Sequence, residues 1–353
     1  MSEVMTFLDR KDVKISARRY GIDALGAMAQ GLFASLLIGT ILTTIGQLAG
    51  LPALEEIGAF ASGVKGPAMA AAIGVSLHAP NLVLFSLMAV GAAADSLGGA
   101  GGPLAVYVVA VLACEAGKIV SRETRLDILV TPFITICCGV LLSMAFAPAI
   151  GSAAMSIGQF IMWAVAQQPL IMGMIVSVLM GIVLTLPISS AAICAALSLT
   201  GLAGGAALAG CCAQMVGFAV QSYKVNGIGG LCAQWIGTSM LQMGNIVRKP
   251  VIWIPTILTS ALTGPIASCI FRLQMNGSPV ASGMGTCGLV GQIGVVTGWM
   301  NEIAEGSKVS ISAFDWTGLI LISFVLPAVL TLIFNWICLK KGLYTEEDLK
   351  LDI

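Results

Sequence analysis

The chain has 353 residues, of which 58% are hydrophobic and only 10% are charged, and its mean hydropathy is +0.98. A soluble domain carries roughly 25% charged residues, so the composition excludes an ordinary soluble protein and predicts a polytopic membrane protein. The 17 basic and 17 acidic residues balance, which argues against nucleic acid as a partner. With one histidine and no CxxC pair, the sequence predicts no metal site and no cofactor.

The N-terminal segment, residues 1–20, is basic and is followed by the first apolar run. By the positive-inside rule, we expect this end to be cytoplasmic. Its apolar positions fit an interfacial helix as well as they fit a solvated lead-in. Residues 21–340 are predicted to form a single transmembrane domain, and residues 341–353 a cytoplasmic tail.

The apolar runs predict ten membrane crossings, with both termini on the cytoplasmic side. In chain order we expect them at Ala24–Ala49, Pro67–Leu77, Leu82–Leu97, Leu104–Val120, Ile128–Ala147, Leu170–Leu186, Ile188–Leu202, Gly205–Val220, Val251–Phe271 and Trp316–Leu339. The glycines of Gly98–Pro103 predict a tight turn between the third crossing and the fourth.

Two glycine-rich segments, Val225–Pro250 and Gly264–Gly298, are too polar or too broken to be simple spans. Lipid cannot satisfy the free N–H and C=O groups of such backbone, so it must be surrounded by protein or line a cavity. Broken segments of this kind line the binding sites of transporters. We therefore predict an all-α polytopic membrane protein of about ten helices, with two re-entrant hairpins that form the solute site.

Ionisable side chains within the membrane are functional candidates, because burying them there is costly. His78 lies at a predicted helix break. There we expect it to contact a solute hydroxyl or relay a proton, or else only to hydrogen-bond to the backbone of the kink. Asn81, three residues later, is a further candidate solute ligand. Glu115 is a second candidate, although Lys118 at i+3 favours a plain ion pair. Asp95 is a third candidate for a functional residue. The alternative is that it only binds or caps the backbone of the Gly98–Gly102 turn.

Amide and hydroxyl side chains gather in the two glycine-rich segments. Such uncharged donors and acceptors suit a neutral sugar or polyol, whereas the alternative is hydrogen bonding between helices. The predicted solute ligands here are Gln234, Gln242, Asn245, Asn276, Ser278, Thr286 and Gln292. Four tryptophans are candidates for stacking on a sugar face: Trp235, Trp253, Trp299 and Trp316. The last three lie near predicted span ends, where anchoring at the membrane interface is the favoured role.

Three stretches, Gly101–Ile136, Gly230–Ile266 and Asn276–Gly294, resemble the phosphotransferase-system enzyme IIC-like family that includes the perfringolysin O regulator. The resemblance extends from about residue 65 to 340. It implies a homodimeric carrier in the bacterial inner membrane with two re-entrant hairpins. In related IIC proteins a separate IIB subunit phosphorylates the solute at the cytoplasmic face.

The chain departs from sugar-specific IIC proteins at one point. Those proteins place a His and a Glu, the Glu often in a Gly-Ile-Thr-Glu type motif, near the hydroxyl to be phosphorylated, whereas this chain has no acidic residue from Ile128 to Asn301. Only His78, Glu115 or Asp95 could take their place. The leading hypothesis is a carrier that moves a small neutral hydroxylated solute by alternating access, with coupling to IIB left open. The alternatives are a membrane sensor or regulator without phosphotransfer, and an ion channel or ion-coupled exporter.

Overall fold

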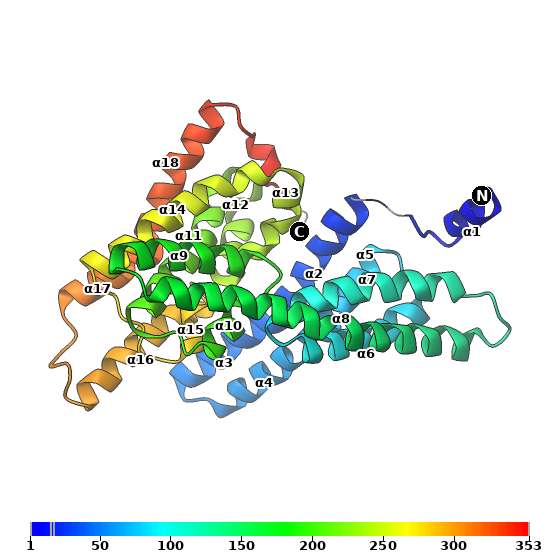
Figure 1. Cartoon of the computed structure of the whole chain (residues 1–353), viewed down its shortest axis with the longest axis horizontal. Helices are drawn as coiled ribbons and strands as arrows, with labels where there is room; N and C mark the ends of the chain where they lie inside the picture. The colour runs from blue at the N-terminus through cyan, green and yellow to red at the C-terminus, as the bar shows by residue number, and fades with distance from the viewer. Residues whose placement is uncertain (1, 15, 17, 352–353) are drawn as a thin grey trace. The chain divides into compact units, whose positions relative to one another are not determined.

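The computed structural model describes residues 2–14, 16 and 18–351 (Figure 1). Met1, Ile15, Ala17, Asp352 and Ile353, which fall in the predicted terminal segments, lie outside the described residues. In the described part every regular element is helical, apart from one isolated bridge between Gly201 and Met275. The all-α class is therefore confirmed.

Six helices of the described chain are long and apolar enough to cross a membrane. They span Arg19–Gly46, Asn81–Val120, Asp127–Val165, Gly201–Gln221, Pro250–Ile270 and Ala313–Lys340. Pro169–Thr185 is a shorter apolar helix. These helices confirm a polytopic membrane protein, while the count of ten crossings stays a prediction.

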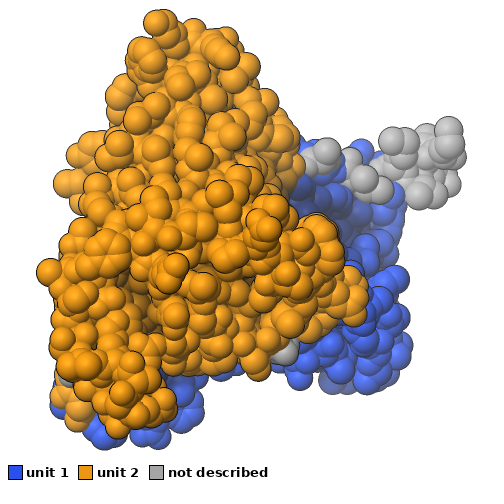
Figure 2. Space-filling view, turned by 60° about the vertical axis from the view of Figure 1, so that its left-hand side comes forward, with its two compact units in different colours: residues 1–43, 51–153, 353 blue, residues 44–50, 154–352 orange. Residues whose placement is uncertain are grey.

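The chain forms two compact units, coloured separately in Figure 2. Unit 1 comprises residues 1–43, 51–153 and 353, and unit 2 comprises residues 44–50 and 154–352. Two helices, α3 (Ile38–Ala49) and α8 (Asp127–Val165), contribute residues to both. The other helices of unit 1 are α1 (Ser2–Arg10), α2 (Leu25–Leu32), α4 (Pro52–Gly63), α5 (Lys65–Ser76), α6 (Asn81–Gly98) and α7 (Gly102–Val120).

The predicted turn at Gly98–Pro103 is confirmed in unit 1. Helix α6 ends at Gly98, a 3₁₀ turn covers Gly99–Gly101, and α7 begins at Gly102. Gly99 has a φ of +51°, which a residue with a Cβ rarely adopts. Helices α6 and α7 consequently pack along each other, and α5 packs against both.

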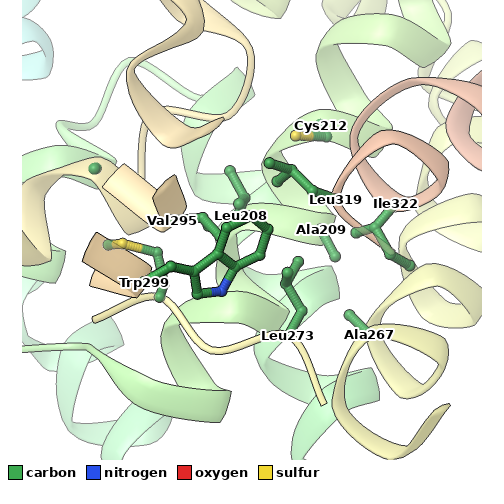
Figure 3. Packing of buried hydrophobic residues seen from close by; sticks show 11 residues of the cluster. Leu208, Ala209, Cys212, Ala267, Leu273, Val295, Trp299, Leu319 and Ile322 are labelled. Atoms are coloured by element: carbon green, nitrogen blue, oxygen red, sulfur yellow. The ribbon is translucent and has the colours of Figure 1, made fainter. Parts of the chain in front are cut away.

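Unit 2 is built around α11 (Gly201–Gln221), which is buried along almost its whole length. Helices α9 (Pro169–Thr185), α14 (Ile254–Pro265) and α18 (Leu326–Lys340) pack against it. The remaining helices are α10 (Ser190–Ala196), α12 (Tyr223–Cys232), α13 (Met243–Arg248), α15 (Pro279–Ser282), α16 (Val290–Ala304) and α17 (Ala313–Ile320). On one side of α11, Trp299 fills an apolar cluster with Leu208, Leu273 and Val295 (Figure 3).

The predicted crossing Ile188–Leu202 is wrong as a single helix, because α10 has only seven residues. Ser198 and Gly201 adopt φ values of +49° and +61°, which end the helix and redirect the chain. Residues 188–202 instead form hydrogen bonds to the second glycine-rich segment. Ser190 Oγ donates to Gly283 O at 2.7 Å, and Leu199 O accepts from Ser282 Oγ at 2.7 Å.

The predicted crossing Ile128–Ala147 begins as expected but does not end at Ala147. Helix α8 runs through Pro132 and Pro148 to Val165, a length of 39 residues. A proline inside a helix removes one backbone hydrogen bond and often kinks the helix without ending it. The apolar run on both sides of Pro148 continues the helix here.

Small residues allow the helices around α11 to approach closely. A Cβ placed on Gly210 of α11 would lie 1.8 Å from the carbonyl oxygen of Ser177 in α9. A Cβ on Gly264 of α14 would lie 2.1 Å from the carbonyl oxygen of Gly173, also in α9. Backbone atoms cannot move aside as a flexible side chain can, so these glycines set the helix spacing.

We predict that Gly210→Ala lowers the free energy of unfolding by about 1–3 kcal/mol or more, because the methyl group forces α9 and α11 apart. Thermal unfolding in detergent measures the effect. The control is Gly26→Ala in α2, where nothing lies within 4 Å of the added Cβ. That change should be neutral or slightly stabilising, since alanine is the better helix former. Equal losses in both variants would contradict the close-packing account.

Candidate functional site

The amides of the first glycine-rich segment form a chain of hydrogen bonds. Asn245 Nδ2 donates to Gln242 Oε1 at 2.8 Å, and Gln242 Nε2 donates to Gln234 Oε1 at 3.0 Å. Gln234 Nε2 in turn donates to Ser222 Oγ at 2.8 Å and to Gly230 O at 3.0 Å. The structure thus brings these three predicted solute ligands together, but their amide groups bind one another and the protein backbone.

The predicted ligands of the second segment lie at different places. Asn276 Nδ2 donates to Glu302 Oε1 at 2.5 Å, and Asn276 Oδ1 accepts from Gly201 N at 3.1 Å. Ser278 is exposed at the start of α15. Thr286 and Gln292 are buried. Thr286 contacts the first segment at Trp235, and Gln292 contacts α11 at Cys212.

We call the place where the two broken segments meet the junction, formed by Trp235, Thr286, Gln292, Cys212 and Ser323. Thr286 Oγ1 donates to the carbonyl oxygen of Trp235, which joins the two segments directly. Gln292 Nε2 lies 3.4 Å from Cys212 Sγ, and the Ser323 hydroxyl lies beside the same sulfur. Cys212 is the twelfth residue of the 21-residue α11, so the junction lies near the middle of that helix.

Three buried polar atoms at the junction lack a regular hydrogen-bond partner among the described residues: Trp235 Nε1, Gln292 Oε1 and Ser323 Oγ, the last of which contacts only the weakly hydrogen-bonding thiol of Cys212. Most buried polar groups in proteins are hydrogen-bonded, so three exceptions in one region call for an explanation. Together they present one obligatory donor, one obligatory acceptor and one hydroxyl that does both. A hydroxylated molecule matches that set, because each of its hydroxyl groups both donates and accepts.

The sequence pattern finds only part of the junction. Trp235, Thr286 and Gln292 are recognisable because they lie in glycine-rich stretches. Cys212 and Ser323 carry no such signal, since a small polar residue in an apolar helix is more often a packing residue. Only the three-dimensional structure places Cys212 against Gln292, and Ser323 against Cys212.

A second feature of unit 2 is a solvent-facing cavity of about 490 Å³ beside Trp299. Asn276, Glu302 and Asp315 contribute polar groups to it, and Lys308 bridges to Asp315 at 3.0 Å. Lys308 also lies over the Trp299 ring, 5.1 Å from its centroid. The cavity lies where α17 begins, whereas the tail follows the other end of the 28-residue helix Ala313–Lys340.

In unit 1, Asp12 and Lys118 link His78 and Glu115 into one charged network. His78 is 77% exposed, and its Nδ1 lies 3.2 Å from Asp12 Oδ2. Lys118 is buried and donates to the carbonyl oxygens of Asp12 at 2.6 Å and Leu77 at 3.0 Å. Its Nζ lies 3.1 Å from Glu115 Oε2, so the predicted ion pair forms, although without hydrogen-bond geometry.

Asp12 is a member of this network that the sequence does not single out. The hydrogen bond from Arg19, with smaller contributions from His78 and Lys118, holds the pKa of Asp12 well below its usual value. Asp12 is therefore ionised at neutral pH and lies within hydrogen-bond distance of the His78 ring. Asn81 stands apart as the exposed first residue of α6. The solute-binding roles of His78, Asn81 and Glu115 remain predictions.

We predict that Lys118→Met destabilises the protein by about 3–5 kcal/mol, because it leaves the Glu115 carboxylate, whose side chain is only 12% exposed, without its cation. The double variant Lys118→Met/Glu115→Gln should recover at least half of that loss, since removing both charges of a buried pair is far less costly. Denaturant unfolding of the two single variants and the double variant measures the coupling. Strictly additive losses would show that the two side chains do not interact.

Broken segments that meet at an uncharged polar site within a helical membrane protein are typical of solute carriers. A family model described as "Phosphotransferase system, EIIC" matches residues 22–351, so the chain belongs to the phosphotransferase-system EIIC family. This makes it a membrane permease component of such a system. Neither the curated proteins nor the solved structures include a significant match to the chain.

Proposed function

We propose that this permease moves a small neutral hydroxylated solute, a sugar or a polyol, and binds it at the junction. The observation that carries the proposal is the set of three unpartnered buried atoms on Trp235, Gln292 and Ser323. No residue of the junction carries a charge, and the sequence has no acidic residue from Ile128 to Asn301. An uncharged site in a low-dielectric region favours a neutral ligand over an ion.

The proposed mechanism is alternating access within a homodimer in the bacterial inner membrane, with both termini in the cytoplasm. Five basic residues support this orientation, because they lie at or next to the end of unit 2 that carries the tail: Lys224, Arg248, Lys249, Lys340 and Lys341. Cytoplasmic loops carry such an excess of Lys and Arg. A separate IIB subunit would then phosphorylate the solute on this side.

The alternative function is a membrane sensor or regulator that binds the same class of solute without phosphorylating it. One observation favours it: the chain lacks the Gly-Ile-Thr-Glu type motif of sugar-specific IIC proteins. Uptake into membrane vesicles distinguishes the two functions. We expect labelled sugars or polyols to accumulate when IIB and the phosphorylated phosphocarrier protein are supplied. If a broad panel gives neither accumulation nor phosphorylation, the transport proposal fails and the regulator remains as the alternative.

The junction is tested by a pair of serine variants. We predict that Ser323→Ala leaves the free energy of unfolding unchanged or slightly higher, because the buried hydroxyl that it removes has no regular hydrogen-bond partner beyond the weak contact with the Cys212 thiol. The same variant should weaken solute binding about three- to tenfold, the effect of one lost hydrogen bond. Solute titration against intrinsic fluorescence and thermal unfolding measure the two effects separately.

The matched control is Ser177→Ala in α9. Ser177 is also fully buried, but its hydroxyl donates to Ser260 O at 2.7 Å. Its removal should lower stability by about 1 kcal/mol and leave solute affinity unchanged. If Ser323→Ala lowers stability and not affinity, the Ser323 hydroxyl is a structural group and the junction is not the binding site.

A further inference from the structure

The C-terminal tail, residues 344–351, is folded into unit 2. Tyr344, Leu349 and Leu351 are 2%, 0% and 7% exposed, although the sequence around them is strongly charged. The Tyr344 hydroxyl donates to Asn335 Oδ1 at 2.7 Å and accepts from Gln221 Nε2 at 3.0 Å. A short 3₁₀ helix, Glu346–Leu349, follows and is closed by a capping box between Thr345 and Asp348.

The first glycine-rich segment binds the main chain of this tail through three side-chain amides. Leu349 O accepts from Asn226 Nδ2 at 2.9 Å and from Gln242 Nε2 at 3.0 Å. Lys350 O accepts from Asn245 Nδ2 at 2.8 Å, and Leu351 N donates to Asn226 Oδ1 at 2.8 Å. Asn226 thus both donates to residue 349 and accepts from residue 351, which is how an amide holds an extended peptide.

Two ion pairs fix the tail at the two ends of the same segment. Lys224 Nζ lies 2.5 Å from Glu346 Oε1, and Lys249 Nζ lies 2.8 Å from Asp348 Oδ2. The Lys249 hydrogen bond holds the pKa of Asp348 below its usual value. Asp348 therefore stays charged at neutral pH, and this attraction weakens only as acid protonates the carboxylate. The charges match because the segment is bracketed by bases and the tail carries acids.

The tail is connected to the junction through the amide chain. Gln242, which binds Leu349 O, also donates to Gln234, the residue before Trp235. Between Gln234 and Gln242 the helix is broken at Thr238, whose backbone is extended. Gly227, with a φ of +60°, provides a second break near the start of the segment. The tail thus holds a segment that has breaks on both sides of Trp235.

We propose that the C-terminal tail is an intramolecular latch. It holds the first glycine-rich segment in its closed position, and its release opens the junction to the cytoplasm. The latch itself does not require transport. Only the idea that solute uses the opened path rests on the proposed function. The latch also assigns Gln242 and Asn245 to the tail, whereas the sequence pattern predicts them as solute ligands.

The test measures access to two buried thiols of unit 2, Cys212 and Cys287, which are 0% and 2% exposed. Inside-out vesicles of the full-length protein are treated with N-ethylmaleimide, and mass spectrometry locates the label. A thiol reacts only when reagent reaches it, so the labelling rate reports opening. No solute, IIB or phosphate donor is present, so the result does not depend on transport.

Truncation after Asp348 removes the tail's hydrogen bonds to Asn226, Gln242 and Asn245. We expect it to accelerate labelling of Cys212 and Cys287 by at least about tenfold, because each lost hydrogen bond favours opening by roughly two- to tenfold. Adding a synthetic peptide of residues 344–353 should slow the labelling again. Labelling at the parental rate in a truncated protein with unchanged melting temperature would overturn the latch.

If the truncated chain does not fold, point variants of the full-length protein test the latch in its place. Asn226→Ala removes two hydrogen bonds to the tail and should accelerate labelling by about fourfold or more. The control is Glu347→Gln, which removes one tail charge at an exposed position and should leave the rate unchanged. The latch is wrong if Asn226→Ala behaves like this control. If uptake fails for all solutes while labelling still depends on the tail, the latch stands and the transport proposal falls.

Discussion

The structure of unit 2 depends on one constraint: backbone that is not helical must find hydrogen-bond partners within the protein when it lies in an apolar environment. The two glycine-rich segments contain several such stretches, and side chains satisfy them. Ser190 and Ser282 tie the second segment to residues around α10, and Thr286 ties it to Trp235. Many polar residues in these segments therefore serve to hydrogen-bond the protein's own backbone, and their presence alone does not define a ligand site.

The polar groups of the two segments therefore fall into two sets: amides that already hydrogen-bond to protein, and buried atoms that have no protein partner. Gln234, Gln242 and Asn245 are occupied by one another, by backbone and by the tail. Trp235 Nε1 and Gln292 Oε1 lie in the same pair of segments but have no partner in the described protein. We propose the junction as the solute site because a bound hydroxylated solute would satisfy these buried groups.

The sequence predicts the class of fold well, because hydropathy and glycine content act locally. It predicts the Gly98–Pro103 turn, the two broken segments and the Glu115–Lys118 pair, each of which depends on neighbours in sequence. It fails at Ile188–Leu202, where Ser198 and Gly201 turn the chain towards the second segment. It also cannot assign partners that are distant in sequence: Asn245 binds Lys350, 105 residues away. Whether an amide binds a solute or a tail is a property of three-dimensional packing.

We propose that the EIIC permease binds a neutral hydroxylated solute where the two broken segments meet. A cryo-electron microscopy map of the protein with a transported sugar or polyol tests this binding site most directly. We expect solute density within hydrogen-bond distance of Trp235 Nε1, Gln292 Oε1 and Ser323 Oγ. Density confined to the cavity beside Trp299, with those three atoms still unpartnered or bound only to water, would contradict it.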